Sequence, residues 1–340
     1  MRYLFLILNN LLRLFPLYLI RFINMIKVFI SFKHIKNKLK NKNKTIYMVY
    51  DFETTNPTFG EYLWFLLIAR YFLLKNKKVE LIVIDDLTKN CSFNILTKNE
   101  IVNFKKELQK LTLFFLKKNF TEYSNFNKFK LDFNNKKEKI LFSFLVFNKL
   151  KIYDFLFKLI NLLLSKENDK FLNKIKFTRK NIKLTKKLNK IKPYICWNIR
   201  KNTKWGNYNN TKNELIQIAN YLGVQKKNHN IIVLSDKKTC IWARKILKKF
   251  NNILYSDKVA DNFVKCAAAI IHSEYYFQYK GGGILFIAYL SNVPYKIISF
   301  HAPLDTRFSS EKYLSWQNRN QKRVYHYKKI NLPGILKEKL

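Results

Sequence analysis

The second half of the chain alternates between two kinds of segment. Short apolar runs, rich in Ile, Val and Tyr, are each followed by a longer segment whose apolar residues recur at helical spacing. The expected strands cover residues 193–200, 230–236, 252–256, 268–273 and 294–299. Strands that alternate with helices form a parallel sheet with helices on its faces. Residues 193–310 are therefore predicted to be a Rossmann-like domain.

The first half shows the same alternation less regularly. Apolar runs at 45–50 and 79–85 flank a helical segment at 60–76, which predicts the start of a second parallel sheet. We assign residues 45–165 to this second Rossmann-like domain. Lysine-rich residues 166–192 are expected to be a solvated connector, although the same lysines could contact nucleic acid or lipid. Residues 311–340 are expected to form a helical tail.

Residues 1–44 combine an apolar helix pattern with a polybasic end. Polar residues of the first 31 positions share one arc of the helix, and twelve residues rich in lysine follow at 33–44. No uncharged apolar run approaches the ~20 residues of a membrane span. The pattern predicts an amphipathic helix on an anionic membrane surface. Packing of this helix on the protein's own core, or a single span, are the alternatives.

The formal net charge of +43 suggests a nucleic-acid partner at first sight. The chain, however, is rich in residues with A/T-rich codons and contains only 7 glycines and 6 prolines, which indicates codon bias as the main source of the charge. No helix-turn-helix, RNA-recognition or zinc spacing supports nucleic-acid binding. The four cysteines form no CxxC pair, which is typical of a reducing compartment and excludes the common zinc and redox motifs.

Three of the seven glycines are consecutive, at Gly281, Gly282 and Gly283, directly before an apolar helix-like run. Exposed N–H groups at a helix start suit a phosphate or diphosphate, and missing side chains let the ligand approach the backbone. No Lys-Ser/Thr follows, so the motif is not a P-loop, and it is not GxGxxG. A plain loop without a ligand is the alternative.

Other polar residues are expected at the carboxyl ends of the strands, where ligands bind in open parallel sheets. Arg200 ends the expected strand at 193–200, in a chain that otherwise prefers lysine. Its planar guanidinium suits bidentate phosphate recognition. An ordinary surface arginine is the alternative. The remaining donor-site candidates are Ser235, Asp236, Ser273 and Glu274.

The order of these features resembles a known enzyme family. The second half is similar to the donor-binding domain of GT-B glycosyltransferases, and most similar to their fucosyltransferase-like branch. The similarity lies in the order of three segments: Arg200 in "NIR", then "VLSD", then "ADNFVKCAAAIIHSEYYFQYKGGGILFIAYLSNVPYKI". The resemblance implies two Rossmann-like domains facing a cleft, a nucleotide-sugar donor held by the strand arginine and the glycine loop, and no obligatory metal or other cofactor. The acidic residue that the family places shortly after the strand arginine is absent, because "RKNTKWGN" follows.

Sugar transfer by inversion needs a base for the acceptor hydroxyl. Asp51 and Glu53 follow the first strand and are the candidates, although their loop also contains Asn and Thr residues that could cap the next helix. The predicted enzyme transfers a hexosyl- or fucosyl-type sugar to a glycan or lipid-linked acceptor in polysaccharide biosynthesis, on the cytoplasmic face of a membrane. A nucleic-acid-binding protein and an inactive membrane-surface scaffold remain the alternatives.

Overall fold

The chain divides into two compact units, Met1–Ile175 and Lys176–Leu340. The computed structural model describes residues 45–52, 59–85, 98–136, 139–143, 163–164, 167–180, 182–201, 209–280, 283–300 and 321–326, with Leu332 and Leu336. The predicted amphipathic segment 1–44 lies outside the described residues. The unit boundary falls within the predicted connector 166–192, whose described part contains helices α7 (Asp169–Ile175) and α8 (Lys186–Lys190).

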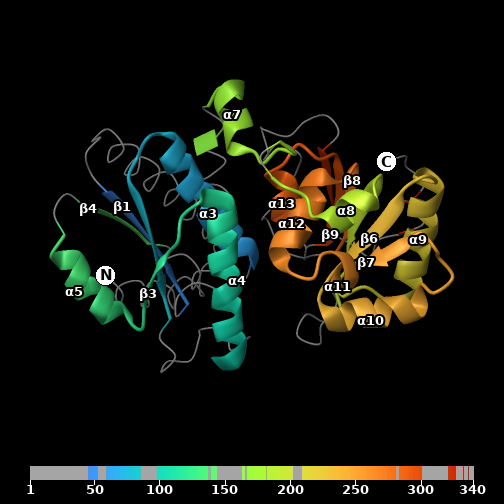
Figure 1. The fold of residues 1–340 in the computed structure, drawn as a ribbon, viewed down its shortest axis with the longest axis horizontal. Coiled ribbons are helices and arrows are strands. Elements are labelled where there is room, and N and C mark those ends of the chain that lie inside the picture. The colour runs from blue at the N-terminus through green and yellow to red at the C-terminus, as the bar shows by residue number, and fades with distance from the viewer. Residues whose placement is uncertain are drawn as a thin grey trace, which may run out of the picture. The chain divides into compact units, whose positions relative to one another are not determined.

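The N-terminal unit contains a four-stranded parallel sheet (Figure 1). Its strands are β1 (Thr45–Asp51), β2 (Val79–Ile84), β3 (Thr121–Tyr123) and β4 (Lys139–Ser143), and its helices between them are α3 (Phe59–Leu74), α4 (Lys98–Leu116) and α5 (Phe126–Asn134). The strand order is β3-β2-β1-β4. Successive strands pair from β1 towards β3, and β4 then returns to the other side of β1.

Both faces of this sheet are covered, which explains why β1 and β2 are apolar almost throughout. On one face, the Tyr50 ring packs edge-on against Tyr62 of α3, with ring centroids 5.0 Å apart. On the other face, Val49 packs with Phe129 of α5. Because α3 is buried around most of its circumference, it reads as a continuous apolar run rather than as an amphipathic helix.

A single arginine joins three helices of the N-terminal unit. Arg70, near the end of α3, donates from Nε to the carbonyl of Ile175 (3.0 Å), and from its terminal nitrogens to Phe115 (3.1 Å) and Lys174 (2.9 Å). These carbonyls belong to the last turns of α4 and α7, where helices lack intrahelical donors. The guanidinium of α3 therefore supplies hydrogen-bond donors to the carbonyl ends of α4 and α7.

The C-terminal unit contains a six-stranded parallel sheet, also seen in Figure 1. Its strands are β5 (Tyr194–Asn198), β6 (Asn230–Leu234), β7 (Ile253–Tyr255), β8 (Tyr275–Tyr279), β9 (Tyr295–Phe300) and β10 (Gln321–His326). The order β10-β9-β8-β5-β6-β7 is that of a doubly wound Rossmann fold. Successive strands are added from β5 to β7 on one side of the sheet and from β8 to β10 on the other. The α/β class with Rossmann-like sheets is confirmed.

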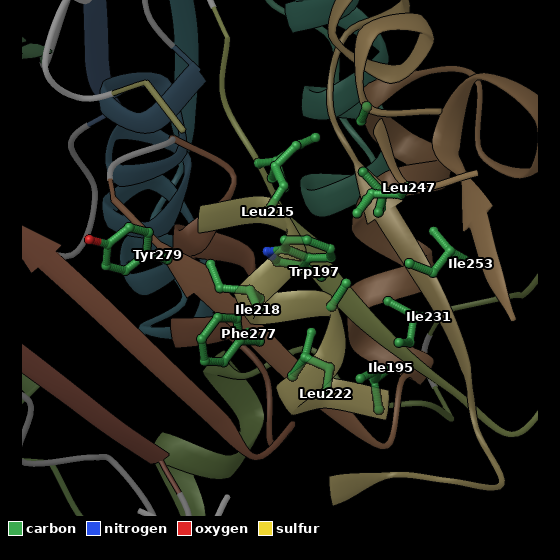
Figure 2. Close-up of a cluster of buried hydrophobic side chains, with 14 of the residues drawn as sticks. Ile195, Trp197, Leu215, Ile218, Leu222, Ile231, Leu247, Ile253, Phe277 and Tyr279 are labelled. Atoms are coloured by element: carbon green, nitrogen blue, oxygen red, sulfur yellow. The ribbon is translucent and has the colours of Figure 1, made fainter. Parts of the chain in front are cut away.

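The main core of this unit lies between the sheet and helices α9 (Lys212–Gln225) and α10 (Lys237–Ile246). Trp197 of β5 lies at its centre, with Leu215 and Ile218 of α9 and Phe277 of β8 around it (Figure 2). Helices α12 (Phe263–His272) and α13 (Leu285–Tyr289) lie on the opposite side of the sheet in Figure 1. The Cys196, Cys240 and Cys266 thiols are buried.

Two expected elements are wrong. Residues 268–272, predicted as a strand, complete helix α12, and the strand is β8, which begins at Tyr275. The predicted helical tail 311–340 contains strand β10, which pairs with β9. Asn262 is the N-cap of α12, and its side chain accepts a hydrogen bond from the backbone N–H of Lys265. Among the described helices, none is both long and apolar enough to cross a membrane.

Candidate functional site

Each sheet has one point at which the direction of strand addition reverses. In the N-terminal unit this switch point lies between β1 and β4, and in the C-terminal unit between β5 and β8. Ligands of open parallel sheets bind outside the carboxyl ends of the strands at such points, because the flanking connections leave in opposite directions and open a crevice. The strand order thus selects two places in the described chain where a ligand is expected.

Asp51 is the last residue of β1 and stands at the switch point of the N-terminal unit. Its side chain is buried, with 1 % of the residue exposed. Glu53, the other candidate base, lies outside the described residues. Within the part of the chain that the structure describes, no group of three or more His, Cys, Asp or Glu side chains is arranged to hold a metal ion.

Arg200 follows β5 at the switch point of the C-terminal unit, as predicted. Its backbone is held by buried Asn210: the Arg200 N–H donates to Asn210 Oδ1 (2.8 Å), and the Asn210 N–H donates to the Arg200 carbonyl (2.8 Å). The Asn210 Nδ2 also donates to the carbonyl of Tyr279, the last residue of β8 (3.3 Å). Asn210 thus joins the ends of the two strands that border the switch point. Burial lowers the pKa of the Arg200 guanidinium from its ordinary value.

Lys280 directly follows β8 on the other side of the switch point and immediately precedes the glycines. Its φ is +67°, in the left-handed region that a lysine seldom adopts. The ammonium lies 2.8 Å from Glu214 Oε1 and donates to the Asn209 carbonyl at 2.8 Å. Only 7 % of the residue is exposed. Arg200 and the entry to the glycine loop are therefore adjacent in the sheet, at the ends of paired strands.

Of the glycines, Gly283 is described, whereas Gly281 and Gly282 lie outside the described residues. The helix after them, α13, has only five residues, so it is much shorter than the apolar run suggested. A single helical turn sums few peptide dipoles. So short a helix does not support the helix-dipole part of the phosphate prediction, and the ligand-binding role of the glycines stays a prediction.

Ser235 and Asp236 lie at the carboxyl end of β6, as predicted, but their polar atoms bond within the unit. Ser235 Oγ donates to the Ile199 carbonyl at 3.0 Å. Asp236 is the N-cap of α10 and accepts from the Thr239 N–H (2.9 Å) and from its hydroxyl (2.7 Å). These hydrogen bonds explain the local fold, and the donor-binding role of both residues stays a prediction.

Ser273 and Glu274 are not at a carboxyl end, which corrects the sequence prediction. Both precede β8, and the Glu274 N–H donates to the carbonyl of Tyr194, the first residue of β5. This is the amino edge of the sheet, opposite to the switch point. Arg179 donates to the Ser273 carbonyl (2.7 Å) and pairs with Glu274 (3.0 Å). The error follows directly from placing the strand at 268–273.

Three residues of the site were missed by sequence reasoning: Asn210, Glu214 and Lys280. One of them belongs to a recognisable signal, because Glu214 forms a capping box with Thr211 at the start of α9. That signal predicts a helix start, but it does not predict that Glu214 also binds Lys280. Only the pairing of β5 with β8 brings these residues together.

Comparison with known proteins gives structural likeness without sequence likeness. No protein-family model matches the chain, and no curated protein matches its sequence. A family 9 glycosyl transferase from Veillonella parvula is 9 % identical, with 84 % of this chain and 86 % of that chain covered and a TM-score of 0.47. The heptosyltransferase WaaC of E. coli with ADP-2-deoxy-2-fluoro heptose is 10 % identical over 82 % and 92 %, with a TM-score of 0.41. The ADP-heptose lps heptosyltransferase II of E. coli is 11 % identical over 86 % and 96 %, with a TM-score of 0.42.

Proposed function

We propose that this chain is a glycosyltransferase that takes its sugar from a nucleotide-sugar donor. The observation that carries the proposal is the switch point of the C-terminal sheet, where Arg200 and Lys280, the residue before the glycines, follow the ends of two paired strands. An arginine fork and a backbone without side chains are together suited to the two charged groups of a diphosphate. The rest of the nucleotide sugar extends along the carboxyl ends of the strands.

The chemistry assigned to these residues is transfer of the sugar carbon from the diphosphate oxygen to an acceptor hydroxyl. The Arg200 guanidinium stabilises the negative charge that grows on the leaving diphosphate. The base that removes the acceptor proton is Asp51, the last residue of β1 in the N-terminal unit, or Glu53, two residues later in the sequence. The proposal needs no metal and no cofactor besides the donor itself. A hexosyl- or fucosyl-type sugar and a glycan or lipid-linked acceptor complete it.

The test is calorimetric titration of the full chain with UDP, GDP and ADP. At least one should bind, and Arg200→Lys should weaken that affinity about ten-fold, because a charge-assisted hydrogen bond of roughly 1.5–3 kcal/mol is lost although the charge stays. The matched control is Arg244→Lys. Arg244 pairs with Asp257 on the same unit and should leave the affinity unchanged.

Equal affinity of wild type and Arg200→Lys would remove Arg200 from the site. If none of the three nucleotides binds, the nucleotide-sugar proposal is wrong. Transfer of labelled sugar from the matching nucleotide sugar to a membrane extract, with and without a chelator, then tests the activity and its independence of metal.

The proposed location is the cytoplasmic face of a membrane, through the segment 1–44. The full chain should sediment with vesicles that contain anionic lipid, and part of it should be released by high salt, since lysines supply only the electrostatic share of binding. Deletion of 1–44 should abolish sedimentation. Recovery of the full chain in the supernatant at low salt would contradict the location.

A further inference from the structure

The residues that border the C-terminal switch point are joined into one bonded cluster, formed by Arg200, Asn210, Glu214 and Lys280, which we call the switch-point junction. Asn210 holds the Arg200 backbone in both directions and also bonds to Tyr279. Lys280 reaches Asn209 and Glu214. The junction therefore connects the end of β5, the start of α9 and the entry to the glycine loop.

Several hydrogen bonds hold Lys280 in its backbone conformation, which has a positive φ. Its N–H donates to the Ile298 carbonyl (2.8 Å), and its carbonyl accepts from Gln278 Nε2 (2.8 Å). Its ammonium donates to the Asn209 carbonyl and to Glu214. A residue other than glycine with a positive φ persists only where its surroundings determine its conformation. The side chain of Lys280 is one of the contacts that do so.

The Glu214 carboxylate both caps helix α9 and forms an ion pair with Lys280. It receives the Thr211 N–H at 2.8 Å in the capping box of α9, and its two oxygens lie 2.8 and 3.0 Å from the Lys280 ammonium. The side chain is 19 % exposed, and that of Lys280 is 8 % exposed. A lysine whose ammonium is held by a carboxylate and a carbonyl in a nearly buried place is bound within the protein rather than offered to an incoming anion.

We propose that the Lys280–Glu214 ion pair is a positioning device for diphosphate binding: it holds Lys280, directly after β8, and the backbone of Arg200, after β5, at the spacing that the ligand needs. The inference rests on the proposed function and deepens it. Lys280 is a positioning residue that acts through its own backbone and that of Arg200, not a ligand of the phosphate. Both members of the pair are therefore required to the same extent.

The test compares Lys280→Met, Glu214→Gln and the double variant in calorimetric titration with whichever of UDP, GDP and ADP the wild type binds. Glutamine serves as well as glutamate in a capping box, so Glu214→Gln removes the charge but keeps the helix start. Each single change should weaken binding about ten-fold. The double variant should be no weaker than either single one, because both break the same pair.

Two controls separate the ion pair from its surroundings. Thr211→Ala removes the cap and keeps the pair, so the chain should lose stability but not nucleotide affinity. Lys280→Gly relieves the positive φ but removes the ammonium, and should bind as weakly as Lys280→Met. Wild-type affinity of Lys280→Gly would mean that only the backbone conformation matters and would overturn the proposal.

The direction of the Glu214→Gln effect decides between positioning and direct contact. If Lys280 bound the phosphate itself, freeing its ammonium from Glu214 would leave the affinity unchanged or raise it, and this result would sink the proposal. Hydrogen exchange supplies a reading without nucleotide: the amides of Arg200 and Asn210 should exchange at least about ten-fold faster in Lys280→Met. Unchanged exchange overturns the positioning role, whereas wild-type chain that binds none of the nucleotides overturns the proposed function with it.

Discussion

The two units share the strand order around their switch points. Each contains a group of hydrogen bonds that joins several elements, and these two groups lie at opposite edges of their sheets. In the C-terminal unit, Asn210 and Lys280 form their bonds at the carboxyl ends of β5 and β8. In the N-terminal unit, Arg70 bonds to the ends of α4 and α7. Because α3 runs back from the carboxyl end of β1 to the amino end of β2, Arg70 lies towards the amino edge of its sheet.

This difference separates two uses of the same fold. Bonds at the amino edge hold helices together on the side where open parallel sheets bind nothing. Bonds at the carboxyl edge determine the shape of the place where such sheets bind ligands. Changes in the C-terminal network should therefore alter binding, whereas changes around Arg70 should alter only stability.

The largest expected effect is on the core of the C-terminal unit. Trp197→Ala should lower the free energy of unfolding by about 3–5 kcal/mol, because the indole is fully buried among α9, α10 and the neighbouring strands. Denaturant unfolding followed by circular dichroism measures the loss. Trp242→Ala is the control, since Trp242 is only partly buried against the same cluster and should cost less. Equal losses would show that the cluster around Trp197 is not the main core.

The next effect concerns the helix ends of the N-terminal unit. Arg70→Lys should lower the free energy of unfolding by about 2 kcal/mol, because one ammonium cannot reach the three carbonyls that the guanidinium satisfies. Nucleotide affinity should not change. Lys75→Ala removes the partly exposed pair with Glu167 and should cost less than about 1 kcal/mol. A loss of nucleotide affinity in Arg70→Lys would break the division between the two edges.

The smallest effect tests whether a residue at the carboxyl edge can be purely structural. Asp236→Ala should cost about 1 kcal/mol through loss of the α10 cap, whereas Asp236→Asn should cost little, because asparagine caps equally well. If Asp236 also contacts the donor through its charge, both variants should weaken nucleotide binding. Thermal unfolding and calorimetry on the same samples separate the two roles.

The alternation of strands and helices could be predicted because parallel strands covered on both faces are continuous apolar runs. β1, β2, β5 and β6 were recognisable for this reason. The exception is informative. Residues 268–272 have the Ile and Ala content of a buried strand, but they also continue the helix that the Asn262 cap begins, and the helix prevails. β10 was missed because its sequence, QKRVYH, lacks an apolar run.

Only those site residues that carry a distinctive signal in the local sequence could be predicted. Arg200 was identifiable as a rare arginine at a strand end, and its position after the carboxyl end of β5 is confirmed. Lys280 resembles dozens of other lysines in the sequence, and nothing local links it to Glu214, 66 residues away. Such a partnership depends on the pairing of β5 with β8, which strand patterns do not specify.

Three buried thiols in the C-terminal unit make its local unfolding measurable by cysteine alkylation. Burial raises the pKa of Cys266 to about 12 and raises those of Cys196 and Cys240 as well. Since only the thiolate reacts with alkylating reagents, these side chains are shielded twice, by access and by protonation. Their alkylation proceeds through forms in which the sheet and helices have separated. Its rate, followed residue by residue by mass spectrometry, therefore measures how often this unit opens.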